Sequence, residues 1–325
     1  MGINVAQTLI TGILEGGFYA LAAVGLSLIF GVQRILNVAQ GAFIVLAAFV
    51  TIQFSLILTP KLNLDPLYSL VVDFVLLGVL GGFVYFLLIY KIENSGFEAP
   101  LLATFGLSIF LEYIITNGLE FSFTIFSYPV NLKLLAPLDP SGGFGALAQH
   151  QNYSFSSVQF MNLILPEPQL IALILAITCI PLLQLFLSKT YAGKAIRATG
   201  QDWQAAEFSG IDIRKTRLLC FSLGSAFAGL AGGIYAFSNS VTASSADISL
   251  LPLILVVIVL GGVGSIIGTL VGGLLVGLIM NLSDLFEQTI LTGFSLPAGF
   301  GMLVTFMIFL IVLMVKPTGI FGRSN

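Results

Sequence analysis

The stretch from 189 to 217 holds the residues whose types and spacing best suit a specific interaction with another molecule. Gln204, Ala205 and Ala206 are followed by three residues and then by Gly210. Two adjacent alanines let a helix approach a partner closely, and a glycine just beyond them is typical of a helix end. From these residues alone, a solvated loop is the first interpretation, and a short helix with a docking face is the alternative.

The same stretch carries half of the basic residues of the chain. Of the 12 Lys and Arg residues, it contains Lys189, Lys194, Arg197, Arg214, Lys215 and Arg217. Apolar residues are interspersed among these charges, a pattern that favours two short amphipathic helices able to dock in a groove. We predict that the break between the two helices falls at Thr199-Gly200.

Acidic residues in or beside apolar stretches are the next candidates, because a charge at the centre of a bilayer costs ~2.5 to 3.5 kcal/mol on insertion scales. Glu15 lies in the first such stretch and is a candidate for the path of a transported solute; the alternative is a structural role. Four other acids lie near the ends of their stretches, where we expect interfacial water to solvate them: Asp73, Glu112, Asp284 and Glu287.

Two amides, Asn37 and Gln40, follow the first long apolar run. Amide groups can hydrogen-bond either a solute or the polypeptide backbone. Both residues are therefore candidates for the translocation path or for a helix break, and the alternative is that they cap helix ends.

No catalytic set is recognisable, and we expect no cofactor and no metal. His150 is the single histidine, too few for a histidine-based zinc or haem site. Cys179 and Cys220 lie in apolar runs, where a buried thiol is expected in place of a redox pair or a metal ligand. A net charge of −3 gives no electrostatic footprint for nucleic acid.

Composition indicates the elements that must position these residues. Hydrophobic residues make up 57% and charged residues 8%, against ~45 to 50% and ~25% in soluble domains. These values exclude a cytosolic enzyme, a disulfide-stapled secreted domain and a disordered chain. The sequence therefore predicts a protein embedded in a lipid bilayer, crossing it several times.

Runs without any charge locate the crossings, since a helical span needs ~20 mostly apolar residues. Such runs occupy 16–33, 35–60, 74–90, 99–111, 168–188, 218–246, 248–283 and 288–315. They are too long for the alternating strands of a β-barrel. We predict an all-α fold: one polytopic transmembrane helical bundle of about eight to nine spans, forming a single domain over 1–325.

Orientation follows from the cations, because short loops rich in Lys and Arg stay in the cytoplasm. The loop 189–217 is therefore predicted to be cytoplasmic. A nine-span arrangement with the N-terminus outside then places Arg34, Lys91 and the tail with Arg323 inside. It places the segment 117–167 outside.

Glycines indicate where helices break and where they pack. The run 248–283 is too long for one span, and Gly261, Gly262 and Gly264 mark a turn or break that leaves two crossings or a re-entrant segment. Small residues four apart allow close helix packing. Such tracks occur at Gly224, Ala228 and Gly232, at Ser225, Gly229 and Gly233, and at Gly264, Gly268 and Gly272, followed by Gly273 and Gly277.

Several stretches together resemble the LivH-type branched-chain amino acid permeases of ATP-binding-cassette importers. They are Y-A-L-A-A-V-G-L-S-L-I-F-G at 19–31, N-V-A-Q-G at 37–41, G-K-A-I-R-A at 193–198, A-A-E-F-S-G-I at 205–211, L-G-G-V-G-S-I-I-G-T-L-V-G-G at 260–273 and K-P-T-G-I-F-G at 316–322. Their order and spacing match from end to end. The sequence departs from the family at Gln40, commonly His, and at Gln204, usually Glu in the docking motif E-A-A-x-x-x-G.

The resemblance implies an importer permease of type II architecture in a bacterial cytoplasmic membrane. A LivM-like second permease subunit, two cytoplasmic ATPases and an external substrate-binding protein are its implied partners. Gln204, Ala205, Ala206 and Gly210 would then contact an ATPase. Rigid tilting of packed spans would switch access between the two sides, and ATP hydrolysis would occur in the partner chains.

Other functions are open from the sequence. Within the same class, urea, a sugar or a nucleoside could replace an amino acid as the cargo. A secondary transporter driven by an ion gradient would show intramembrane charge pairs or an inverted repeat, and neither is evident. A membrane scaffold without transport activity would not need the docking pattern.

Overall fold

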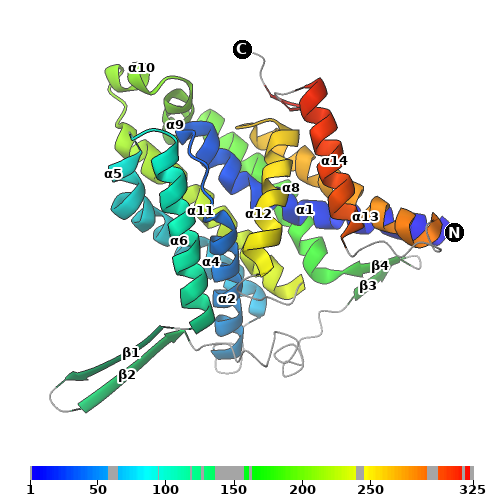
Figure 1. Ribbon diagram of the computed structural model, residues 1–325, viewed down its shortest axis with the longest axis horizontal. Helices are drawn as coiled ribbons and strands as arrows, with labels where there is room; N and C mark the ends of the chain where they lie inside the picture. The colour runs from blue at the N-terminus through cyan, green and yellow to red at the C-terminus, as the bar shows by residue number, and fades with distance from the viewer. Residues whose placement is uncertain are drawn as a thin grey trace.

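The structure is a helical bundle with two small strand pairs (Figure 1). The computed structural model describes residues 2–57, 65–93, 95–117, 119–125, 128–135, 157–160, 163–238, 245–290, 299–316 and 319–322. Within these ranges, six helices are long and apolar enough to cross a membrane, and three shorter apolar helices accompany them. The prediction of an all-α polytopic bundle is confirmed. His150 and Arg323 lie outside the described residues.

The apolar helices follow the predicted runs. They are α1 (Gly2–Gln33), α2 (Gln40–Ile57), α4 (Ser69–Val84), α6 (Glu98–Asn117), α8 (Glu167–Lys189), α11 (Ile213–Ser238), α12 (Ser245–Gly261), α13 (Ile266–Ile290) and α14 (Phe300–Val315). A 3-10 turn, η1 (Pro66–Tyr68), precedes α4, and a π-helical turn, η2 (Tyr85–Ile89), joins it to α5 (Tyr90–Ile92).

Helix α1 lies at the centre of the bundle. It packs against α11 and α13, and also against α8 and α12. Helix α11 in turn packs against α2 and α4, whereas α6 lies at the edge on α2 and η2 (Figure 1). Apolar side chains fill this centre, so that most residues of α1 and α11 are shielded while α4, α6 and α8 keep exposed apolar faces of the kind that lipid covers.

Backbone approaches backbone at the predicted small-residue tracks. A Cβ atom at Gly232 of α11 would overlap the carbonyl oxygen of Ile44 in α2. A Cβ at Gly277 of α13 would overlap the carbonyl oxygen of Gly12 in α1. The glycine tracks therefore serve helix packing, as small residues four apart predict.

The run 248–283 breaks where its glycines predict. Helix α12 ends at Gly261 and α13 begins at Ile266. Gly262 and Gly264 have φ angles of 95° and 78°, in the left-handed region that glycine adopts without steric cost. The C-terminal tail packs on this turn: the Ile320 N–H donates to the Leu260 carbonyl at 2.8 Å.

The predicted external segment contains short strands. Strands β1 (Leu119–Ile125) and β2 (Tyr128–Leu135) form an antiparallel pair that projects from the bundle (Figure 1). The shorter strands β3 (Ser157–Phe160) and β4 (Leu163–Pro166) form a second antiparallel pair near the N-terminal end of α1 (Figure 1). Gln7 Nε2 of α1 donates to the Ile164 carbonyl of β4 at 2.6 Å, and the Ile164 N–H donates to Gln7 Oε1 at 2.9 Å. The start of α1 and the end of the segment 117–167 therefore lie at the same end.

One expectation about the acidic residues is wrong. Asp73 is not solvated at an interface, because its side chain is fully buried between α2, α4 and α11. Thr51 of α2 donates its hydroxyl proton to Asp73 Oδ2. A hydrogen-bonding partner 22 residues away, which only the packed helices bring near, replaces the expected water. Asp284 is exposed, in agreement with the prediction.

Candidate functional site

The basic stretch forms two helices, as predicted, but the break lies elsewhere. Helix α9 (Tyr191–Gln201) continues through Thr199-Gly200, and the chain changes direction at Asp202 before α10 (Trp203–Phe208). Thr199 keeps its hydroxyl within the helix by donating to the Ala195 carbonyl at 2.9 Å. Asp202 ends one helix and begins the next, because its extended backbone and its carboxylate suit an N-terminal cap.

Helix α10 has a well-defined cap at each end. The Asp202 carboxylate accepts from the Gln204 and Ala205 N–H groups at 2.9 and 3.1 Å. At the other end, the Gly210 N–H donates to the Glu207 carbonyl and the Ile211 N–H to the Ala206 carbonyl, which is the Schellman pattern. Gly210 has a φ angle of 81°. Gly210 therefore ends the helix, as expected.

The four candidate docking residues divide between two faces. Ala206 is buried against the rest of the protein, whereas Gln204, Ala205 and Gly210 are exposed. Phe208, one of the apolar residues interspersed among the charges but not one of the four candidates, is 92% exposed at the end of α10. Its signal was an aromatic residue inside a charged loop. Helix α10 thus exposes small, polar and aromatic groups at the surface.

The region that carries α9 and α10 contacts the ends of several distant helices. Arg217 of α11 pairs with Glu93, which follows α5, at 3.0 Å. The Gln33 amide at the end of α1 donates to the Arg217 carbonyl at 2.7 Å. Trp203 of α10 lies under the Arg217 guanidinium group, with 5.9 Å between Cζ and the ring centre. All segments predicted to be cytoplasmic that the structure describes gather at this end.

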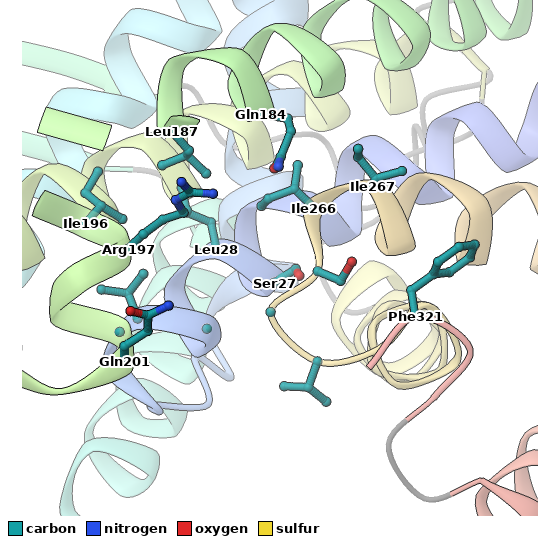
Figure 2. A pocket seen from close by; sticks show the side chains of 16 residues that line it. Ser27, Leu28, Gln184, Leu187, Ile196, Arg197, Gln201, Ile266, Ile267 and Phe321 are labelled. Atoms are coloured by element: carbon teal, nitrogen blue, oxygen red, sulfur yellow. The ribbon is translucent and has the colours of Figure 1, made fainter. Parts of the chain in front are cut away.

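Two cavities adjoin this region. One, of about 390 Å³, lies between the end of α1, the α9–α10 junction and Arg217. The other, of about 380 Å³, lies between α1, α8, α9 and the turn before α13. Figure 2 shows Gln184, Arg197 and Gln201 around the second cavity, with Phe321 of the C-terminal tail at its far side.

The start of α11 is held by a local acidic cap. Asp212 accepts from the Lys215 N–H at 3.1 Å and pairs with the Lys215 ammonium group at 3.0 Å. The hydrogen bond from that backbone N–H, with the one from the Lys215 side chain, lowers the pKa of Asp212. The cap therefore stays ionised at neutral pH and fixes the exit from Gly210 into α11.

Glu15 of α1 contacts two other helices, α8 and α13, away from α9 and α10. Its carboxylate accepts from Asn281 Nδ2 of α13 at 2.8 Å and from Gln169 Nε2 of α8 at 3.2 Å. All three side chains are partly buried. Sequence reasoning selected Glu15 but missed both amides, whose only signal was their polarity at the ends of apolar runs.

Asn37 and Gln40 lie together in the core. Both side chains are fully buried, and Asn37 Nδ2 donates to Gln40 Oε1 at 3.4 Å. Gln40 also starts α2, its N–H donating to the Asn37 carbonyl at 3.2 Å. The pair stands where the chain turns from α1 to α2. The structure does not bring it to Glu15.

Within the described residues, no three His, Cys, Asp or Glu side chains are grouped to hold a metal ion. Cys179 and Cys220 are free thiols, and Cys220 is buried with its Sγ 3.4 Å from the Leu28 carbonyl oxygen.

Known proteins resemble this chain over nearly its full length. The family described as branched-chain amino acid transport system, permease component, matches residues 8–313. The permease BraD of Pseudomonas aeruginosa is 25% identical, over 98% of this chain and 96% of that protein. The permease LivH of Escherichia coli K12 is 26% identical over the same shares, 98% and 96%.

A more distant relative matches a shorter part. The nucleoside ABC transporter permease NupB of Lactococcus lactis is 36% identical over 67 residues, 21% of this chain and 18% of that protein. No solved structure gives a significant match. The helices that could span a membrane and the family match over 8–313 agree, and the predicted resemblance is confirmed. This multi-pass membrane protein belongs to the family of permease components of branched-chain amino acid transport systems.

Proposed function

We propose that the chain is the membrane-spanning permease subunit of an ATP-binding-cassette importer for branched-chain or other neutral amino acids. The family match over residues 8–313 carries this proposal. The two full-length relatives described above are named as high-affinity branched-chain amino acid transport permeases. In this role the chain forms the path for the solute, and partner chains hydrolyse ATP.

The proposed partners are a LivM-like second permease subunit, two cytoplasmic ATPases and an external substrate-binding protein. The exposed face of α10 supports the ATPase contact. Aromatic residues are common energetic anchors of interfaces, and Phe208 is 92% exposed beside Gln204 and Ala205. Ala206 anchors α10 to the permease, while Gly210 sets the turn that presents it.

The proposed orientation places the N-terminus outside and the C-terminus in the cytoplasm of a bacterial cytoplasmic membrane. Residues 189–217 then form the cytoplasmic docking loop, and 117–167 the external segment, of a single domain over 1–325. The support is physical: the basic loop meets the ends of α1 and α11 at one end, and short basic loops stay in the cytoplasm.

The proposed mechanism is alternating access driven from the ATPases. Their closure on ATP moves α10, and packed spans tilt as rigid units to open the path to one side or the other. Glu15, Asn37 and Gln40 remain candidates for this path. Glu15 is the strongest of the three because it is only partly buried, whereas Asn37 and Gln40 are enclosed.

The test is to co-express the tagged chain with the products of the genes beside its own, to purify it and to reconstitute what is recovered in lipid vesicles. We expect recovery of two ATPases and a second permease, and ATP-dependent uptake of labelled leucine when the binding protein is added. Recovery of the chain alone, with uptake that collapses on dissipation of an ion gradient, would overturn the proposal.

A nucleoside is the second candidate cargo, because the chain shares 36% identity over 67 residues with a nucleoside permease. The same vesicles separate the two. Uptake of labelled uridine without uptake of leucine would assign the nucleoside.

A further inference from the structure

Arg217 and Glu93 form an ion pair between two distant helical segments, and both side chains are largely buried. Arg217 Nη1 lies 3.0 Å from Glu93 Oε1, and the two side chains are only 12% and 6% exposed. Removing two charges from water is unfavourable, so a buried ion pair is weak evidence of stabilisation. Its best-attested role is to favour one specific arrangement of the elements that it connects. The question is which elements this pair connects.

Hydrogen bonds from two other helical segments complete the network. The Tyr85 hydroxyl donates to Glu93 Oε2 at 2.9 Å, and the Tyr85 ring is fully buried. Gln33 at the end of α1 donates to the Arg217 carbonyl at 2.7 Å. The pair therefore joins α1, the segment from η2 to Glu93, and α11.

A change of helix type makes the contact between Tyr85 and Glu93 possible. In an α-helix of 3.6 residues per turn, residues seven apart are nearly aligned, whereas residues eight apart diverge by about a quarter of a turn. The π turn η2, closed by the Tyr90 N–H on the Tyr85 carbonyl, adds one residue to the turn. It thereby brings Glu93, eight residues on, to the face of Tyr85. Such turns occur often at functional sites.

The docking helix connects to this network through Trp203. Trp203 is the first residue of α10, and its ring lies 5.9 Å from Arg217 Cζ. One turn earlier on α11, Arg214 Cζ lies 4.1 Å from the ring centre of Tyr90. A cation over an aromatic face is attracted to it. Two arginines of α11 therefore connect α10 on one side with α5 on the other.

The network has room to change. The cavity of about 390 Å³ is lined by Gln33, Glu93, Trp203 and Arg217. Two buried polar atoms that belong to these residues, Arg217 Nε and Gln33 Oε1, have no hydrogen-bond partner within the described structure. Because these two atoms are unpaired and lie beside a cavity, Arg217 and Gln33 can form different hydrogen bonds in a second arrangement of the helices.

We propose that Arg217 and Glu93 are positioning residues that transmit movement of α10 to the spans. When an ATPase moves α10, Trp203 shifts against Arg217, and Arg217 carries Glu93, Tyr85 and the end of α1 with it. The link is specific to this ion pair and goes beyond the docking contact itself. It rests on the proposed function, because it requires ATPases that act on α10.

The experiment uses the full complex in lipid vesicles and measures ATP hydrolysis and solute uptake in the same sample. Glu93→Gln keeps the size and an acceptor oxygen but removes the charge. We expect ATPase recovery and basal ATP hydrolysis to be unchanged, and uptake per ATP to fall ~5-fold or more, the lower end of typical coupling between sites. Tyr85→Phe, which removes the hydroxyl bonded to Glu93, is also expected to lower the uptake per ATP.

A matched control lies on the same helix. Lys215→Gln breaks the pair with Asp212, which is also 3.0 Å long but has side chains 85% and 50% exposed. Uptake per ATP is expected to stay at the wild-type value. A fall equal to that of Glu93→Gln would mean that any charge removal here has the effect, which overturns the inference.

A double variant separates coupling from folding. Arg217→Met with Glu93→Leu removes both charges, so that no unpaired buried charge is left and the fold is preserved. We expect this complex to assemble and to hydrolyse ATP with low uptake per ATP. Wild-type coupling in this variant or in Glu93→Gln would overturn the inference, whereas a wild-type complex without ATPases or ATP-driven uptake would overturn the proposed function.

Discussion

Gly25 of α1 and Gly224 of α11 face each other backbone to backbone at the centre of the bundle. A Cβ at Gly25 would overlap the Gly224 carbonyl oxygen, and a Cβ at Gly224 would lie 2.7 Å from the Gly25 carbonyl oxygen. Backbone atoms cannot move aside as a flexible side chain can. The two helices therefore depend on glycine at both positions.

We predict that Gly25→Val lowers the stability of the detergent-solubilised protein by more than ~3 kcal/mol, above the usual 1 to 3 kcal/mol for overpacking, because the clash is with backbone. The measurement is thermal unfolding followed by circular dichroism. Gly106→Ala is the control, since a Cβ there meets no atom within 4 Å, and its midpoint should stay at or above that of the wild type.

The buried pair of Thr51 and Asp73 leads to a second prediction. Thr51→Val keeps the shape of the side chain but leaves the Asp73 carboxyl without its donor, and an unsatisfied buried group costs ~1 to 3 kcal/mol. Asp73→Asn keeps an acceptor for Thr51 and should cost less than Thr51→Val. Equal midpoints for Thr51→Val and the wild type in the same unfolding assay would show that this bond does not stabilise the helix contact.

A third prediction concerns Gly210. Gly210→Arg should insert normally and abolish substrate-stimulated ATP hydrolysis, because its bulk falls on the exposed side of α10. Gly210→Ala places a Cβ where nothing lies within 4 Å, so its effect is conformational, ~1 to 2 kcal/mol from a left-handed φ. Gly210→Asn, which adopts that φ more readily, should couple nearly as the wild type does.

If Gly210→Arg shows normal stimulation in assembled complexes, α10 is not the docking surface. If Gly210→Asn fails as severely as Gly210→Arg, side-chain bulk at the surface, and not backbone conformation, is decisive.

A fourth prediction tests the path past Glu15. In a background with Cys179→Ser and Cys220→Ala, which removes both free thiols, Glu15→Cys should react with a membrane-impermeant thiol reagent in at least one nucleotide state. Leu26→Cys, on the same helix but fully buried, should not react. Absence of labelling at Glu15→Cys in every state would leave Glu15 a structural residue that joins α8 and α13.

The sequence alone was sufficient for features that depend on local composition. Charge-free runs located the apolar helices, and Gly262 and Gly264 located the break between α12 and α13. Gly210 is predictable as a helix end because glycine readily adopts the left-handed φ at which the next N–H groups bond to the carbonyl groups of the last turn. Asp202 also carries a signal for the break, since Asp is a strong N-terminal cap, whereas Gly200 lies within α9 and does not end it.

Features that depend on distant partners were not predictable. The burial of Asp73 depends on Thr51, and the cluster around Glu15 on residues from two helices more than 150 positions away. The contact of Tyr85 with Glu93 depends on the π turn, and the pair of Glu93 and Arg217 on the packing of two distant segments. In each case the charge was visible in the sequence, while the group that compensates it was set by the packing.

The glycine contacts of α1 also determine how stiff the protein is. Where helices touch through backbone atoms, as α1 does with α11 and α13, there are no side-chain rotamers to exchange, and sliding by a fraction of a turn brings carbonyl groups into collision. The three helices then have few internal degrees of freedom. We therefore expect a displacement at one end of these helices to reach the other end with little local repacking, and deformation to concentrate at the periphery, where α6 packs on α2 and η2.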